Sequence, residues 1–268
     1  MFYTLILRIN STWASAGIDR TLDYYSTNRE LTKSEVVGMI AAALGRSRED
    51  PVDDLAALRY AVRTDRPGRT FTDAQTAVMR VIDKAADLKK EKVARYFFHK
   101  EYLSDASFLV GLESEDLAFL EKIQDAFQHP YYALYVGRKN CVPVEFPGYP
   151  MVAGIREGRL EKVMPEEDGA CPDAQPFGKI QYECLPDEKA DAFLMDQPVT
   201  FSNKGRRYAR RAVRYATYGI PDFYEDSGIP AGGENGYGDS SDGKDSPGQQ
   251  ENDGAGFPGV DTDFFQEA

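Results

Sequence analysis

The stretch LTKSEVVGMIAAALGRSRED, residues 31–50, sets the first constraint on the fold. Thr32 and Glu35 have the spacing of a capping box, in which hydroxyl and carboxylate each accept a backbone N–H at a helix start. The residues that follow are almost wholly apolar, and Gly45 suits the left-handed position just past a helix end. The pattern predicts a helix over about residues 33–44 that is packed on most sides.

Positive charge lies at both ends of this predicted helix. Lys33 and Ser34 stand at its start, where free N–H groups and the helix dipole favour an anion. Arg46 and Arg48 stand at the other end, about 18 Å away at 1.5 Å per residue, so the two ends cannot hold one phosphate. We expect the first pair to contact a bound anion and the second pair to face solvent or a partner. A capped core helix without a ligand would have the same sequence.

The bulk composition limits the class of protein. The chain of 268 residues allows one large domain or two small ones with tails, and 42% hydrophobic residues suffice for a core. We expect no membrane span, since no run of about 18 apolar residues occurs, and no signal peptide. Three cysteines without a C-x-x-C pair favour a reducing cytoplasm. We therefore expect a cytoplasmic protein that binds no metal and no other cofactor.

The acidic residues are concentrated at one end of the chain. The formal net charge is −12, but residues 219–268 hold twelve acids and one lysine, which leaves 32 acids and 31 bases elsewhere. We expect residues 219–268 to form a disordered acidic tail, because they contain few apolar residues. The rest is almost neutral, so local basic clusters can bind phosphates.

The order of the predicted elements indicates an α+β fold. The pattern is βαββαβ, which is the ferredoxin-like arrangement that RRM domains share. We expect residues 1–218 to form one domain, with a basic insertion at about 66–100 and an irregular β region at 141–218. The predicted elements are strands at 2–9, 55–65, 101–112 and 131–136, and helices at 33–44 and 114–129.

Three basic clusters are candidate phosphate-binding sites. In GRKNC, 137–141, the glycine permits a tight turn, the two cations can pair with phosphates, and Asn140 can bind a base edge or sugar. In NKGRRYARRAVRY, 203–215, arginines alternate with tyrosines, as in sites for single-stranded RNA. The third cluster is the lysine run of the insertion. Solvated basic faces, or pairing with the acidic tail for the second cluster, remain open alternatives.

Signals for catalysis are weak. The sequence contains no G-x-S-x-G, P-loop or H-E-x-x-H motif. FHKEY, 98–102, brings His99, Lys100 and Tyr102 close in sequence, as acid–base cleavage of RNA would need. In a strand, however, His99 and Lys100 point to opposite faces, which favours a structural role.

Five segments resemble, in order, the CasD-type subunits of type I-E CRISPR Cascade complexes, which are RAMP-superfamily proteins. The resemblance spans roughly residues 2–216. The segments are YTLILRI (3–9), LTKSEVVGMIAAALGR (31–46), YLSDASFLVGL (102–112), HPYYALYVGRKNCVP (129–143) and PVTFSNKGRRYARRAV (198–213). The second and fourth segments together are fairly specific.

The resemblance implies a non-catalytic subunit that caps the 5′ handle of the crRNA in antiviral defence. It implies a ferredoxin-like body with a protruding β-hairpin thumb, and contacts with the Cascade backbone subunit and large subunit. A sister subtype uses its corresponding protein as a metal-independent endoribonuclease for CRISPR repeat RNA, which is the alternative function. The candidate RNA-binding residues are Arg8, Trp13, Lys33, Ser34, Arg95, Arg138, Lys139, Asn140, Lys204, Arg206, Arg207, Arg210 and Arg211.

The chain departs from the family pattern in two places. After the first strand it has NSTWASAG, 10–17, so only Trp13 carries over from the family's glycine-rich signature. Before the thumb it has TDAQT, 72–76, which lacks the aromatic–His pair of the family. No role is carried over to that position.

Overall fold

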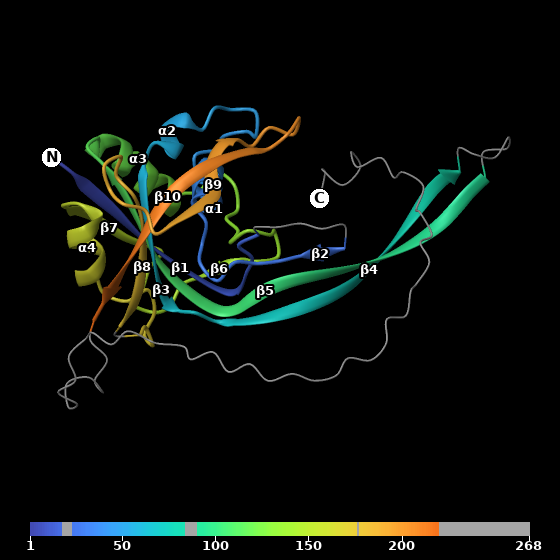
Figure 1. Ribbon diagram of the computed structural model, residues 1–268, viewed down its shortest axis with the longest axis horizontal. Coiled ribbons are helices and arrows are strands. Elements are labelled where there is room, and N and C mark those ends of the chain that lie inside the picture. Colours follow the sequence, from blue (N-terminus) through green and yellow to red (C-terminus); the bar gives the residue numbers. More distant parts are fainter. Residues whose placement is uncertain (18–22, 84–89, 176, 220–268) are drawn as a thin grey trace, which may run out of the picture. The chain divides into compact units, whose positions relative to one another are not determined.

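The structure is a computed structural model that describes residues 1–17, 23–83, 90–175 and 177–219 (Figure 1). In these ranges, ten strands join one sheet and four helices accompany it. The elements are β1 (Tyr3–Ala14), β2 (Tyr24–Tyr25), α1 (Lys33–Ala43), α2 (Asp53–Ala56), β3 (Arg59–Arg66), β4 (Arg69–Asp83), β5 (Lys90–Ser114), α3 (Leu117–Gln128), β6 (Pro143–Val144), β7 (Val152–Glu157), α4 (Leu160–Glu166), β8 (Gly178–Glu183), β9 (Ala192–Thr200) and β10 (Arg207–Tyr218).

The sheet is antiparallel except where the short β2 pairs with β5. Its main order is β6–β1–β5–β3–β8–β10–β9, and β7 pairs with β1 next to β6. The chain crosses from β1 to β3 through α1 and from β5 to β7 through α3. Most β1 residues are buried, because the sheet is covered on both faces in its centre.

Two hydrophobic clusters lie on opposite faces of this sheet. Leu5 and Leu7 of β1 pack with α1 and α3, whereas Ile6 packs with α4. Successive side chains of a strand point to opposite faces, so α1 and α3 share one face and α4 covers the other. The predicted helix over 33–44 is confirmed as α1, including its capping box and the left-handed Gly45 at φ 74°.

The basic insertion forms a long β-hairpin. β4 and β5 pair from Arg69↔Ser104 to Asp83↔Lys90, whereas β5 pairs with β1 only from Leu103 onward. The hairpin therefore continues past the end of β1 as a two-stranded ribbon, with β2 beside it (Figure 1). The separate strand predicted at 101–112 is instead the second half of one continuous strand.

The strand predicted at 131–136 is not formed. The backbone N–H groups of Tyr131 and Tyr132 donate to the carbonyls of Ala43 and Ala42, so this segment caps the C-terminus of α1. The edge of β1 is taken by β6 and β7 instead. The aromatic and β-branched residues of this segment predict a strand. Its N–H groups instead donate to the unpaired carbonyls at the end of α1, which is far away in the sequence.

Other boundaries also differ from the prediction. α3 begins after Asp116, whose carboxylate accepts the N–H of Phe119, rather than at Ser114. The short α2 precedes β3 and overlaps the first two residues of the segment predicted as a strand at 55–65. α4 lies in the region 141–218, which was expected to be irregular β structure. It contains Pro165, a residue that helix interiors disfavour.

None of the helices in the described ranges is long and apolar enough to cross a membrane. All three cysteines are free thiols. The predicted acidic tail, apart from Gly219, lies outside the described residues and stays a prediction.

Candidate nucleic-acid interface

A groove of about 990 Å³ runs along one side of α1. Its walls come from the segment before α1, the segments after α1 and α3, and the β9–β10 hairpin. Five cationic side chains and several aromatic rings line it. The lining residues are Ser15, Gly17, Tyr25, Ser26, Ser34, Glu35, Gly38, Met39, Ala41, Ala42, Arg46, Ser47, Arg48, Tyr132, Ala133, Tyr135, Gly137, Arg138, Lys139, Phe201, Arg206 and Tyr208.

The floor of the groove is a face of α1 with small side chains. Ser34, Gly38, Ala41 and Ala42 lie on it. A Cβ built at Gly38 would have no atom within 4 Å, so the helix backbone is open to the groove there. The sequence predicted a helix packed on most sides, and this is the face that stays open, where a ligand can approach the backbone closely.

One wall of the groove carries Arg138 and Lys139, which follow a turn at Gly137 that requires glycine. Gly137 has φ 88°, and a Cβ there would overlap the backbone oxygen of Ser15. Arg138 donates to the carbonyl of Glu101 at 2.7 Å and lies 4.6 Å from the ring centroid of Tyr102. Its guanidinium is thus held in place at the groove rather than free to swing.

The opposite wall is fixed by contacts between two loops. Arg48 donates to the side chain of Asn203 at 3.0 Å, and Glu49 accepts from Ser202 at 2.8 Å and from the N–H of Asn203 at 3.1 Å. These contacts tie the β9–β10 hairpin to the loop after α1. The hairpin presents the exposed side chain of Arg206 to the groove.

Arg46 and Arg48 therefore line the groove, although the sequence indicated that they face solvent or a partner. Arg46 is paired with Asp54, which holds the pKa of that carboxyl below its usual value. The 18 Å between the helix ends excludes a shared phosphate, but a groove that runs along the helix can contact several phosphates in turn.

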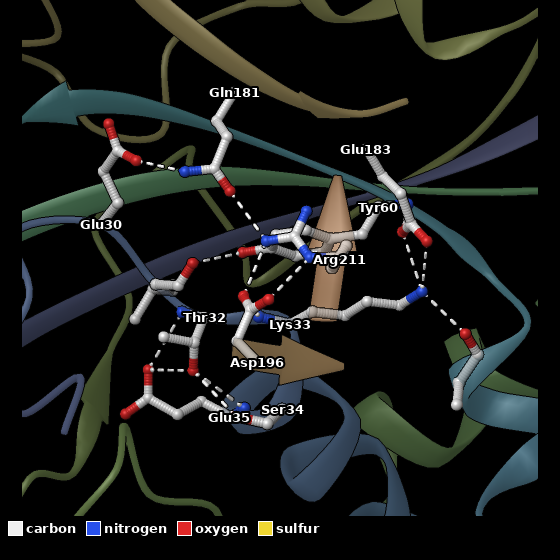
Figure 2. Close-up of polar contacts among 12 residues, drawn as sticks. Glu30, Thr32, Lys33, Ser34, Glu35, Tyr60, Gln181, Glu183, Asp196 and Arg211 are labelled. Atoms are coloured by element: carbon white, nitrogen blue, oxygen red, sulfur yellow. Dashed lines mark hydrogen bonds and ion pairs between the residues drawn. The ribbon is translucent and has the colours of Figure 1, made fainter. Parts of the chain in front are cut away.

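The structure corrects the prediction for Lys33. Its side chain is 1% exposed, and the ammonium donates to Glu183 at 2.8 Å and to the carbonyl of Ala56 at 2.7 Å. The backbone N–H of Lys33 donates to Asp196 at 3.0 Å (Figure 2). The anion at the backbone N–H of Lys33 is thus a carboxylate of the protein itself, so neither this N–H nor the buried ammonium is available to an RNA phosphate.

Arg211 and Arg8 are corrected for the same reason. Arg211 is buried and forms a two-bonded pair with Asp196 at 2.7 and 2.8 Å (Figure 2). Arg8 is buried too; it donates to the carbonyl of Gly169 and lies 3.6 Å from Glu167. Sequence spacing could not show these partners, because they lie far away in the chain or on another element.

The other candidates divide into two groups. Ser34, Arg138, Lys139 and Arg206 come together in the groove. The rest lie outside its lining and remain predictions. Of these, Lys204, Arg207 and Arg210 are exposed on the β9–β10 hairpin, Arg95 is exposed on the ribbon, Asn140 bonds to the hydroxyl of Tyr102, and Trp13 is 42% exposed beside Phe71 and Tyr102.

The residues of FHKEY do not share a site. His99 is exposed on one face of the ribbon, and Lys100 lies on the other face, 5.9 Å from the ring centroid of Tyr25. Tyr102 is 1% exposed and its ring packs against Phe71 at 5.4 Å between ring centroids. Among the described residues, no group of three or more His, Cys, Asp or Glu is placed to hold a metal ion.

Sequence reasoning missed the aromatic part of the groove. Tyr25, Tyr132 and Tyr135 line it together with Tyr208. The run YYALYV was assigned to a strand, so its rings were not considered as a surface. Tyr132 and Tyr135 of this run lie just before the predicted basic turn 137–141, and this position next to a basic cluster is a usable signal.

Comparison with known proteins gives consistent results. The family described as CRISPR-associated protein (Cas_Cas5) matches residues 4–214. The chain is 30% identical over 156 residues to the CRISPR system Cascade subunit CasD of Escherichia coli (strain K12), which covers 53% of this chain and 68% of that protein.

Two solved structures have similar folds. A chain of a CRISPR RNA-guided surveillance complex has a TM-score of 0.65 at 28% identity, over 82% of this chain and 92% of that one. A Cas protein crystal structure has a TM-score of 0.58 at 33% identity, over 81% and 95%. The family match spans most of the chain, and the mostly antiparallel fold is of the RAMP-like kind. The chain belongs to the Cas5 family of CRISPR-associated proteins.

Proposed function

We propose that this chain is a structural subunit of a type I-E CRISPR Cascade surveillance complex and that its groove binds the 5′ handle of the crRNA. The observation that carries this is the groove beside α1, where five cations and four tyrosines gather. Arginine and lysine pair with phosphates, and tyrosine rings stack on unpaired bases. The relative CasD is a Cascade subunit by name, which supports the same complex.

The sheet order supports a ferredoxin-like core within this fold. β7, β1, β5 and β3 are neighbours in that order, and α1 and α3 make the two crossovers on one face. This is the βαββαβ pattern. Residues 1–218 would form the RNA-binding domain, and the β4–β5 ribbon would be the thumb that contacts the neighbouring backbone subunit. The large subunit is the third expected partner, and the cytoplasm the expected location.

The proposed role is binding without cleavage. The groove cations are arginines and a lysine on fixed loops, and His99 points away from Lys100 on the ribbon. Acid–base cleavage needs the reacting groups within hydrogen-bond reach of one substrate atom. The separation of His99, Lys100 and Tyr102 therefore favours a scaffold over an endoribonuclease.

The test uses 5′-labelled CRISPR repeat RNA in EDTA, followed on native and denaturing gels. We expect the RNA to shift and stay intact. Arg206→Ala and Lys139→Ala should each weaken binding about tenfold, because each removes a charge-assisted contact. Each should also lower the salt slope by about 0.7. Lys122→Ala on α3, an exposed lysine outside the groove, is the matched control and should bind as the wild type does.

Two results would contradict the proposal. A discrete cut in EDTA would make the protein a processing nuclease. Equal affinity of the wild type, Arg206→Ala and Lys139→Ala would place the RNA elsewhere on the protein.

A further inference from the structure

Glu35 is the one acidic side chain among the described lining residues of the groove. It lies near the start of α1, next to Ser34 and across from Arg138. An ionised carboxylate at this place would repel RNA phosphates and weaken the attraction of the neighbouring cations. The protonation state of Glu35 therefore matters for a groove that binds a polyanion.

The carboxyl is held in a fixed position. Its Oε2 accepts the backbone N–H of Thr32 at 3.2 Å and lies 3.2 Å from the Thr32 hydroxyl. Its Oε1 faces Gly137, where a Cβ would come within 2.9 Å. The turn that carries Arg138 thus lies against the carboxyl, and Glu35 stays half-buried at the edge of the groove.

The groups around Glu35 come from the N-terminal cap of α1, the turn 137–141, β3 and β9. Burial is the largest influence and raises the pKa of Glu35 to about 8, and the negative charge of Asp196 on β9 acts in the same direction. The hydrogen bonds from Thr32 and the charge of Arg138 lower this pKa but do not outweigh burial. Tyr60 of β3 and Cys141 at the end of the turn also lie within electrostatic range. Burial is the main cause that raises the pKa of both, and the charge of Glu35 adds a smaller effect in the same direction.

We propose that RNA binding in this groove is coupled to protonation of Glu35, so that the neutral carboxyl is the form that accepts RNA. This inference rests on the proposed function. Phosphates that enter beside Glu35 stabilise its neutral form further, and by linkage the protein takes up a proton on binding. Affinity is highest when Glu35 is neutral and falls as the pH rises through 8.

The described histidines, His99 and His129, are absent from the groove lining. Glu35→Gln removes this one carboxyl and leaves every other ionisable group in place. A loss of affinity between pH 6.5 and pH 8.5 that this variant abolishes therefore reports on Glu35.

The first test measures the dissociation constant for the labelled repeat RNA at pH 6.5, 7.5 and 8.5 at constant ionic strength. The wild type should bind at least about threefold more weakly at pH 8.5 than at pH 6.5. Glu35→Gln keeps the capping-box acceptor and should bind equally at all three pH values. Glu121→Gln, a change of an exposed α3 carboxyl outside the groove, should follow the wild type.

The second test needs no RNA. The folded-state pKa of Glu35 is raised above its unfolded value, so its favourable contribution is complete below about pH 4.5 and is lost as the pH rises to about 8. The melting temperature of the wild type should thus fall relative to that of Glu35→Gln between pH 5 and pH 9.

The outcomes separate this inference from the proposed function. Tight RNA binding that does not depend on pH, or that depends on pH equally in Glu35→Gln, overturns the inference alone. No RNA binding at any pH overturns the proposed function and this inference together. A melting-temperature difference that is constant from pH 5 to pH 9 contradicts the titration of Glu35 on which the inference depends.

Discussion

Lys33 and Lys139 have the same charge but opposite surroundings. Lys33 is buried and ion-paired with Glu183, whereas Lys139 is exposed at the groove. Burial lowers the pKa of Lys33, and Glu183 acts against this by favouring its charged form. A buried pair matters for folding when one partner is removed, while an exposed cation matters for a charged ligand.

Two alanine variants test this difference. Lys33→Ala should lower the free energy of unfolding by about 3–5 kcal/mol, because it leaves Glu183 without its cation. Lys139→Ala should change it by less than about 0.5 kcal/mol and weaken RNA binding instead. Urea denaturation gives the first quantity. A Lys33→Ala protein as stable as the wild type would show that the pair contributes little.

The sequence contained the local part of this information. The spacing of Thr32 and Glu35 predicted the cap that the structure shows. It could not show that Asp196 and Glu183, more than 140 residues later, would take the N–H and the ammonium of Lys33. A helix start favours an anion, but at α1 the fold supplies that anion from its own side chain, Asp196.

At the scale of elements, Asp196 joins the β9–β10 hairpin to α1. It accepts from the N–H of Lys33 on α1 and from the guanidinium of Arg211 on β10 (Figure 2). Gln181 of β8 accepts from the same guanidinium at 2.8 Å. This network holds one wall of the groove in register with its floor, although Asp196 does not line the groove.

Asp196→Ala should therefore affect binding from a distance. It leaves Arg211 buried without its carboxylate and should lower the free energy of unfolding by about 3–5 kcal/mol. Amide hydrogen exchange should become faster in β9 and β10. In the folded protein, affinity for repeat RNA should drop as the wall that carries Arg206 loosens. Unchanged exchange in the hairpin would contradict this.

Elements with strong local patterns were predictable, and those that depend on distant partners were not. The apolar run of α1 and the amphipathic pattern of α3 are local signals. The segment 131–136 had a strand composition but became the cap of α1, because Tyr131 and Tyr132 reach its last carbonyls. The sequence predicted an insertion where the ribbon lies. It did not predict that β5 runs as one continuous strand from the ribbon into the sheet.

At the scale of the whole molecule, position of charge matters more than total charge. The formal net charge is −12, yet five cations line one groove. Many of the other arginines are already paired, as Arg8, Arg59, Arg63 and Arg211 are. A count of basic residues in the sequence therefore overestimates how many of them are free to meet a charged ligand. It also does not show that Arg46 and Arg48 line the groove.

Photo-crosslinking followed by peptide mapping tests the central claim most directly. The protein is bound to repeat RNA that carries 4-thiouridine in the 5′ handle, irradiated and digested, and the crosslinked peptides are identified. We predict crosslinks in peptides that contain Tyr132, Tyr135 and Tyr208, and their loss when Arg206→Ala weakens binding. Crosslinks confined to the β4–β5 ribbon, with none in the groove, would contradict the account.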